Sequence, residues 1–267
     1  MTTEVLQGEI ITTGNELISG RVADINARYA ARRLSEAGLG VQAITILGDA
    51  APLLQETLRL ALGRSRYIIV TGGLGPTEDD LTAAAAAEVL GRPLRLDDYL
   101  LSRIKACLEA RGLPWEDKYA RMALIPQGAC ILDPGGSACG FFLCHQGVWL
   151  YFLPGVPWEM QLLFDRYVLP PLLQVAAGGE AVCSRTLRFF GLKEVELEDL
   201  CRQLDRERDR LTVGYYPRFP ENLLTLTLRG GEKDKLEERL DTLTQSLAEL
   251  AGPAYLGPED QTLEEQV

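Results

Sequence analysis

The fold is decided by one segment, Thr71-Gly72-Gly73-Leu74-Gly75-Pro76-Thr77-Glu78-Asp79-Asp80-Leu81-Thr82. It follows the apolar run 67–70, which predicts a buried strand, and precedes residues 83–90, which predict a helix. A glycine-rich turn between a strand and a helix exposes backbone N–H groups beside the positive helix end, which suits a phosphate. The two adjacent aspartates suit a hard cation such as Mg²⁺. The segment therefore predicts chemistry on a phosphorylated or nucleotide-like ligand.

The N-terminal half alternates strand patterns with helix patterns. Strands are predicted at residues 5–13, 41–47 and 67–70, and helices at 23–37, 52–62 and 80–90. Alternation of short β and α units indicates an α/β fold with a mostly parallel sheet covered on both faces. The middle of the chain predicts helices at 97–111, 115–124 and 158–168, and a hairpin of residues 141–143 and 148–153.

A domain boundary is predicted at residues 176–180, Ala-Ala-Gly-Gly-Glu, which separates residues 1–177 from 181–267. The second part predicts strands and helices in β-α-β-β-α-β order, at residues 184–191, 194–204, 211–216, 223–229, 233–250 and 254–256. That order is typical of a small α+β module of the ferredoxin-like or KH-like kind. The module lacks the GxxG clamp of RNA-binding KH domains, so an assembly or lid role is favoured over RNA binding.

Composition restricts the function classes. The chain has 267 residues, 46% hydrophobic and 24% charged, with a net charge of −11. This profile is typical of a globular protein and disfavours a nucleic-acid or membrane surface as partner. The N-terminal residues lack the pattern of a secretory signal, and no apolar run approaches the roughly 18 residues of a membrane span. A cytoplasmic protein is expected, and its six cysteines, which have no C-x-x-C spacing, are expected to be reduced thiols rather than zinc ligands.

Three predicted strand-end turns carry acidic or polar side chains: residues 13–20, 48–49 and 71–82. The carboxyl ends of parallel strands share one edge of a sheet, where ligands gather. We therefore expect convergence there of the carboxylates of Glu16, Asp49, Asp79 and Asp80, with Asn26 nearby.

A purely structural interpretation of these turns stays open. Both Thr77-x-x-Asp80 and Thr13-x-x-Glu16 fit a capping box, and the glycines fit a tight turn. The segment is not a P-loop, since no Gly-Lys-Ser/Thr follows the glycines, and its spacing is not that of the dinucleotide fingerprint. The turn at residues 153–160, Leu-Pro-Gly-Val-Pro-Trp-Glu-Met, re-aims the chain into a helix and is expected to border the same cleft.

Together these segments resemble the CinA family of competence/damage-inducible proteins. The resemblance runs through residues 13–20, 71–82, 123–129, 153–160, 190–192 and 214–217, and so covers most of the chain. It implies a three-layer domain of the molybdopterin-binding (MoaB/MogA-like) fold, followed by a KH-like module and assembled as a homodimer. Family members often add a C-terminal amidase domain; since this chain ends at Val267, no amidase activity is expected of it.

The resemblance also implies an activity, the metal-dependent hydrolysis of ADP-ribose to AMP and ribose 5-phosphate. The catalytic residues would be Asp79, Asp80, Glu16 and Asp49, of which Asp79 and Asp80 would bind Mg²⁺, Mn²⁺ or Co²⁺. The substrate would contact Thr71, Gly72, Gly73, Gly75, Thr77, Asn15, Asn26, Gly136, Ser137, Pro154 and Gly155.

Three positions depart from the family pattern. Asn15 stands where an Asp is usual, Asp133 where an Asn is usual, and Cys139 where a proline is usual. Asn15 removes a carboxylate from the first turn. Two alternatives remain. One is a pterin-binding or adenylyl-transferring protein of molybdenum-cofactor metabolism that uses the same cleft. The other, which Asn15 and Asp133 keep open, is a non-catalytic regulatory protein with a degenerate site.

Overall fold

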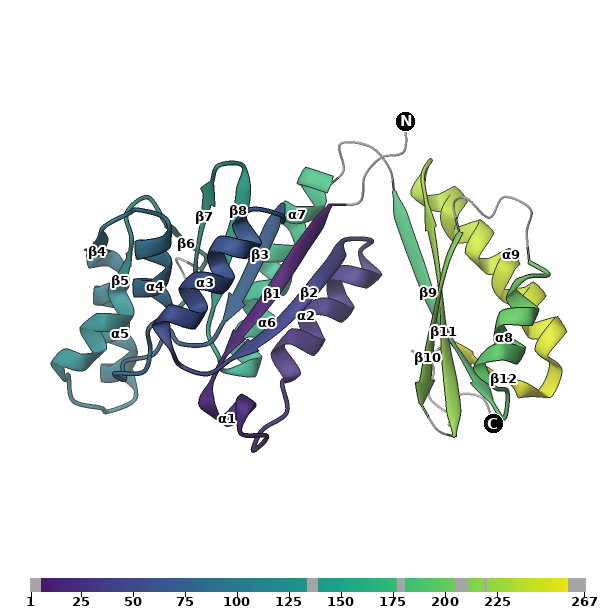
Figure 1. Ribbon diagram of the computed structural model, residues 1–267, viewed down its shortest axis with the longest axis horizontal. Helices are drawn as coiled ribbons and strands as arrows, with labels where there is room; N and C mark the ends of the chain where they lie inside the picture. The colour runs from purple at the N-terminus through teal and green to yellow at the C-terminus, as the bar shows by residue number, and fades with distance from the viewer. Residues whose placement is uncertain (1–5, 134–138, 177–180, 205–210, 219, 259–267) are drawn as a thin grey trace. The chain divides into compact units, whose positions relative to one another are not determined.

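The computed structural model describes residues 6–133, 139–176, 181–204, 211–218 and 220–258. The chain forms two compact units (Figure 1). The N-terminal unit comprises Val5–Ser35 and Leu39–Gln174, and Val175–Val267 makes up most of the C-terminal unit. The boundary expected from the sequence falls largely on residues 177–180, which lie outside the described residues.

A six-stranded sheet, ordered β2-β1-β3-β8-β7-β6, forms the centre of the N-terminal unit. Four neighbouring strands are parallel: β2 (Gly40–Leu47), β1 (Gln7–Thr13), β3 (Tyr67–Thr71) and β8 (Val148–Leu153). Of the other two strands, β7 (Phe141–His145) pairs antiparallel with β8, and β6 (Cys130–Ile131) pairs antiparallel with β7. The predicted mostly parallel sheet is confirmed, and so is the β7–β8 hairpin, whose turn residues Gln146 and Gly147 both have positive φ.

Helices cover both faces of this sheet, because successive side chains of a buried strand point to opposite sides. Ile68 and Val70 pack into one apolar cluster with α3 (Ala51–Leu62), α4 (Thr82–Val89) and α5 (Asp98–Ala110). The helices on the other face are α2 (Ile25–Glu36), α6 (Pro157–Leu163), η2 (Phe164–Val168) and α7 (Leu169–Ala176). The rings of Tyr29 and Phe164 meet edge to face there, 6.1 Å between centroids. The unit therefore has three layers.

Two predicted helices differ from the structure. The helix predicted at 80–90 begins at Thr82, because Asp80 is bonded within the preceding loop. The helix predicted at 115–124 is wrong: residues Asp117–Ala123 form the 3₁₀ helix η1, and Leu124–Pro126 form strand β5, which pairs with β4 (Leu94–Leu96). Ile125 precedes a proline, which favours an extended backbone there. A one-turn helix, α1 (Asn15–Ile18), was not predicted.

The C-terminal unit has the predicted β-α-β-β-α-β order. Its elements are β9 (Val182–Phe190), α8 (Glu194–Cys201), β10 (Leu211–Arg218), β11 (Glu221–Arg229), α9 (Lys233–Ala251), the short η4 (Gly252–Ala254) and β12 (Tyr255–Pro258). The antiparallel sheet is ordered β10-β11-β9-β12. Leu187, Phe189 and Leu226 from the strands pack against Leu240 and Leu247 of α9. The predicted α+β module is confirmed.

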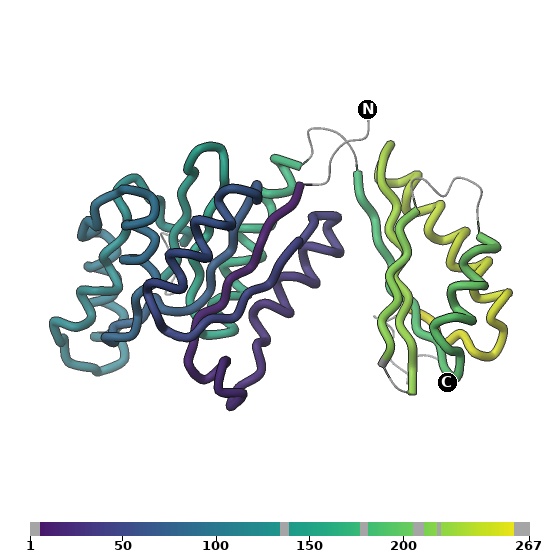
Figure 2. The backbone as a smooth tube through the Cα atoms, in the orientation of Figure 1, coloured from purple at the N-terminus to yellow at the C-terminus, as the bar shows by residue number. Residues whose placement is uncertain are grey.

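The chain path in Figure 2 runs from the purple first strand through the N-terminal unit and then into the green and yellow C-terminal unit. None of the helices in the described parts of the chain combines the length and the apolar composition that a membrane span requires.

Candidate functional site

The loops that follow β1, β2, β3 and β8 border one pocket of about 560 Å³. Strand ends of a parallel sheet gather at one edge, which is where open α/β folds bind ligands. The volume is within the range of small-molecule sites, about 300–1,000 Å³. The pocket is lined by ten of the residues singled out from the sequence: Glu16, Asp49, Gly72, Gly73, Gly75, Thr77, Asp79, Asp80, Pro154 and Gly155.

The glycine-rich turn passes too close to its neighbours for any side chain. Gly72 has φ +103°, and a Cβ atom there would lie 2.4 Å from the carbonyl oxygen of Thr13. Gly73 has φ +66°, and its Cβ would lie 2.3 Å from Oγ1 of Thr82, the hydroxyl that donates to the Gly72 carbonyl at 2.8 Å. The glycines therefore allow the bare backbone to cross between the end of β1 and the start of α4, beside the pocket.

Thr13 brings an unused hydroxyl to this turn. The residue is 8% exposed and lines the pocket, and its Oγ1 atom has no hydrogen-bond partner among the described residues. A buried hydroxyl without a partner is costly, so such a group commonly bonds to a ligand or an ordered water. The structural role that the sequence predicts for Thr13 is the capping box Thr13-x-x-Glu16. That capping box does not form, since Gly14 is the N-cap of α1 and no side chain caps it.

The loop after the glycines holds two carboxylates in place. Asp80 Oδ2 accepts hydrogen bonds from the backbone N–H of Thr77 at 2.8 Å and from its hydroxyl at 2.6 Å. The same hydroxyl also contacts Asp79 Oδ1, and this contact lowers the pKa of Asp79. The bond from the Thr77 N–H to Asp80 is one that the predicted capping box contains, but it closes a loop turn and caps no helix, since α4 begins at Thr82.

Asp49 joins these carboxylates from the end of β2. Its Oδ2 accepts from the backbone N–H of Asn15 at 2.9 Å, and its own N–H donates to Asn15 Oδ1 at 3.2 Å. Burial raises the pKa of Asp49, and the charges of Asp79, Glu16 and Asp80 raise it further. The four carboxylates therefore converge as the strand-end argument expected. Asn15 lies outside the pocket lining and acts on the site by positioning Asp49.

Two further predicted residues support the pocket from behind. Thr71 is 2% exposed and donates its hydroxyl to the Pro154 carbonyl at 2.9 Å, and Asn26 Nδ2 donates to the Gly155 carbonyl at 2.9 Å and to Thr71 Oγ1 at 3.2 Å. These bonds fix the β8–α6 turn against β3, and neither side chain lines the pocket. Gly136 and Ser137 lie outside the described residues.

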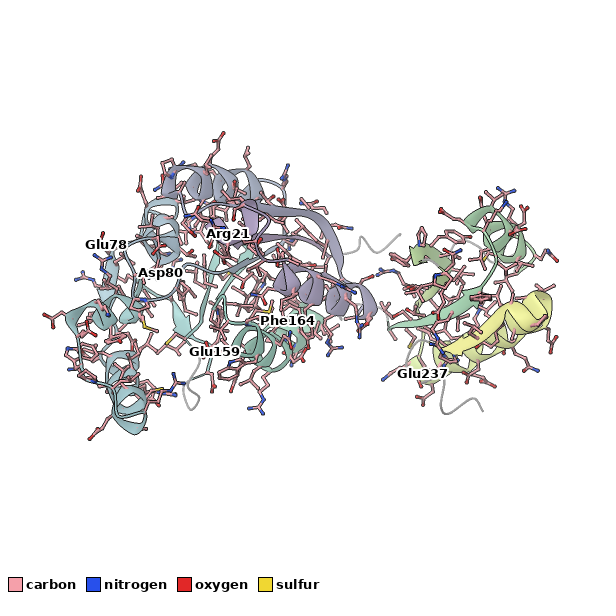
Figure 3. All side chains as sticks on the ribbon, turned by 90° about the horizontal axis from the view of Figure 1, so that it is seen from below. Arg21, Glu78, Asp80, Glu159, Phe164 and Glu237 are labelled. Carbon is pink, nitrogen blue, oxygen red and sulfur yellow. The ribbon has the colours of Figure 1, made fainter. Side chains whose placement is uncertain are left out.

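Sequence reasoning missed one wall of the pocket. The residues of this wall recur at i, i+3, i+4, i+7, i+8 and i+11, which places them on one face of α5: Leu100, Arg103, Ile104, Cys107, Leu108 and Arg111. The helical period of α5 was visible, but a period does not say whether a face meets a core or a cavity. The turn at residues 153–160 borders the pocket as expected from the sequence: Glu159, in the first turn of α6, lines it, and Figure 3 labels this residue together with Asp80. Burial raises the pKa of Glu159, and Arg111 opposes that shift.

The pocket is acidic. Six carboxyl groups and two guanidinium groups line it, the carboxyls being those of Glu16, Asp49, Asp79, Asp80, Asp133 and Glu159. A phosphorylated ligand would be repelled by such a lining unless a cation accompanied it. In the described parts of the chain no three His, Cys, Asp or Glu side chains are grouped to hold a metal ion by themselves. Mg²⁺ commonly needs only one or two carboxylates when phosphate oxygens and waters complete its shell, so the residues present fit such an ion.

Comparisons with known proteins agree with this architecture. Residues 9–174 match the family model described as "Probable molybdopterin binding domain", and residues 184–257 match "Damage-inducible protein CinA KH domain". A solved structure, "The crystal structure of the protein CinA with unknown function from Thermoplasma acidophilum", superposes with a TM-score of 0.57 at 30% identity. It covers 63% of this chain and 98% of that one.

Similar proteins share both domains. "CinA-like protein" of Syntrophus aciditrophicus (strain SB) is 36% identical over 96% of this chain and 61% of its own length. "CinA-like protein" of Syntrophobacter fumaroxidans (strain DSM 10017 / MPOB) is 34% identical over 98% of this chain and 62% of its own length. The chain thus spans about three fifths of the length of these relatives. It belongs to the CinA family, and it joins a domain of the molybdopterin-binding, MoaB/MogA-like fold to a CinA KH domain.

Proposed function

We propose that the N-terminal unit is a metal-dependent nucleotide-sugar pyrophosphatase, with ADP-ribose as its substrate and AMP and ribose 5-phosphate as its products. One observation carries the proposal. The buried hydroxyl of Thr13, which has no hydrogen-bond partner among the described residues, lies beside the glycine-rich turn. Both line the pocket on which the carboxylates of Glu16, Asp49, Asp79 and Asp80 converge. Donors for a phosphate and oxygen ligands for a cation are what a diphosphate requires.

Each part of the pocket has a separate task in this reaction. The Gly72 N–H donates to the Leu153 carbonyl at 3.1 Å, so the backbone N–H groups of residues 73–75 and Thr13 Oγ1 would hold one phosphate, and Asp79 and Asp80 would hold the cation. A bound divalent ion supplies charge neutralisation and a more acidic water. Water oxygen attacks one phosphorus, the bridging P–O bond breaks, and the leaving phosphate keeps the bridging oxygen. Asp49, which lines the pocket and is held in position by the Asn15 N–H, would accept the proton of that water.

The proposal is tested by offering purified protein ADP-ribose with Mg²⁺, Mn²⁺ or Co²⁺ and separating the products by chromatography. Release of AMP with at least one metal is expected. If ADP-ribose stays intact with all three, the proposed activity is wrong.

Replacing Thr13 with valine tests the phosphate subsite. Valine keeps the shape of threonine and removes the unpaired hydroxyl, so we expect ribose 5-phosphate to bind roughly 10-fold more weakly, the loss of about one hydrogen bond to a charged group. The melting temperature should stay within a few degrees of wild type or rise, because no bond within the protein is lost. Binding is measured by calorimetry. Unchanged affinity would remove Thr13 from the site.

A second candidate is binding of a molybdopterin, with or without adenylyl transfer. The matching family model, described as a probable molybdopterin-binding domain, covers residues 9–174, and the α5 wall of the pocket offers apolar surface to a ring system. Tight binding of a pterin with no cleavage of ADP-ribose would favour this candidate over hydrolysis.

A further inference from the structure

The pocket is longer than a diphosphate site needs. Both Leu100, near the start of α5, and Arg111, its C-cap, line the pocket. At about 1.5 Å per residue these positions are roughly 16 Å apart along the helix. The pocket therefore continues along α5 beyond the turn that carries Asp79 and Asp80, and that length has no task in the phosphate chemistry.

This extension has an apolar wall. Its non-polar lining comes from α5, from η1 and from the loops beside them: Leu100, Ile104, Leu108, Leu113, Met122 and Val156. A wall of this composition, with a few polar groups placed at its margin, is typical of sites for flat organic rings.

Glu159 is a carboxyl group that lines the pocket near Arg111, the C-cap of α5. It lies in the first turn of α6, a helix whose N-cap, Val156, makes no side-chain cap bond. A helix start alone would account for an acidic residue. The position at a helix start does not explain why the Glu159 side chain lines the pocket. Nor does it explain why burial raises the pKa of Glu159 although the charge of Arg111 opposes that shift. The carboxyl group is therefore available to a ligand.

We infer that the α5 extension binds a heteroaromatic base with an exocyclic amino group beside a ring nitrogen, and that Glu159 hydrogen-bonds to this amino edge. The ring would lie against the apolar wall of α5. The inference deepens the proposed function and rests on it for the position of the phosphates, since it assigns the base end of the same nucleotide.

Adenine, guanine and pterin share this edge but need different forms of the carboxyl group. In adenine the ring nitrogen is an acceptor, so the neutral acid fits: its O–H donates to the ring nitrogen and its C=O accepts from the amino group. In guanine and pterin the ring nitrogen carries a hydrogen, so the carboxylate fits and accepts from both. Adenine binding should weaken as the pH rises through the pKa of Glu159, and guanine or pterin binding should weaken as the pH falls through it. The ionisable groups that line the pocket around Glu159 are Arg103, Cys107, Arg111, Asp133 and Cys139.

The experiment uses nucleosides, which lack phosphate and so do not report on the carboxylates of the metal end. Adenosine, guanosine, purine riboside and a pterin are titrated into the full chain and followed by the NMR signals of the ligand. We expect adenosine or another amino-bearing ligand to bind at least about 10-fold more tightly than purine riboside, which has no amino group and no N–H in its ring edge.

Three variants complete the test. Glu159→Leu should abolish the preference over purine riboside and weaken binding at least about 10-fold, whereas Glu159→Gln, an amide with one donor and one acceptor, should keep adenosine binding and lose its pH dependence. Glu109→Leu, on the exposed side of α5, is the control and should bind as wild type. The inference is overturned if purine riboside binds as well as every amino-bearing ligand, if none of the ligands binds, or if Glu159→Leu keeps the preference. Nucleoside binding with no cleavage of ADP-ribose would reject only the pyrophosphatase.

Discussion

Replacing Asp80 with asparagine is expected to lower the kcat/KM for ADP-ribose by at least about 100-fold. Asparagine keeps an oxygen that accepts from the Thr77 N–H, so the loop keeps its shape, but it removes the negative charge that would bind the cation. The melting temperature should therefore stay close to that of wild type. Steady-state kinetics and thermal unfolding measure the two quantities on one preparation.

Glu78→Gln is the matched control for this variant. Glu78 precedes the two aspartates, is exposed and does not line the pocket (Figure 3). The Glu78→Gln substitution removes one negative charge, as Asp80→Asn does, at a position two residues from Asp80. The kcat/KM of the Glu78→Gln variant should therefore stay within about 2-fold of wild type. If both variants lose activity equally, the effect belongs to the general charge of the loop, and Asp80 has no special role.

Gly72→Ala is expected to destabilise the N-terminal unit by about 2–4 kcal/mol and to remove its activity. The added Cβ atom would lie 2.4 Å from the carbonyl oxygen of Thr13, which is backbone and has no rotamer to change. The φ of +103° adds strain for any residue with a side chain. Either the loop moves away from β1 or β1 shifts, and both displace the phosphate donors. Urea denaturation gives the change in the free energy of unfolding.

Gly112→Ala separates the two causes. Gly112 also has a positive φ, +67°, but a Cβ atom there meets nothing within 4 Å. Only the backbone cost applies, about 1 kcal/mol. If Gly72→Ala and Gly112→Ala lower the free energy of unfolding equally, the contact of the added Cβ atom with the Thr13 carbonyl oxygen costs nothing. That result would contradict the structural role given to Gly72.

The sequence predicts correctly those helices and strands whose pattern of apolar and polar residues extends over many neighbouring positions. The alternating strands and helices of residues 5–90 and the β7–β8 hairpin follow from apolar runs and turn residues, and so does the order of the C-terminal unit. The β4–β5 pair was not predictable in this way, because each strand has three residues and exists only through the other. Residues 115–124 carried helical spacing, but pairing of Leu124–Pro126 with β4 outweighed it.

The site was predictable where strand-end turns carried acids, since topology alone brings Glu16, Asp49, Asp79 and Asp80 to one edge. It was not predictable where burial decides. Nothing local shows that Thr13 keeps an unused hydroxyl or that one face of α5 forms a wall of the pocket, whereas the turn at residues 153–160, with Glu159, was expected at the cleft and does line it. The departure at Asn15 has a clear structural result, because its amide and backbone hold Asp49 in position. Asn15, in the turn that follows β1, therefore contributes to the acidic cluster by positioning Asp49.

The most direct test is a quantitative product analysis of ADP-ribose incubated with the protein and Mn²⁺. We predict AMP and ribose 5-phosphate in equal amounts, none of either when the metal is chelated, and little of either from Asp80→Asn. Intact ADP-ribose with every divalent metal, or products formed equally well by Asp80→Asn, would contradict a hydrolytic site at the glycine-rich turn.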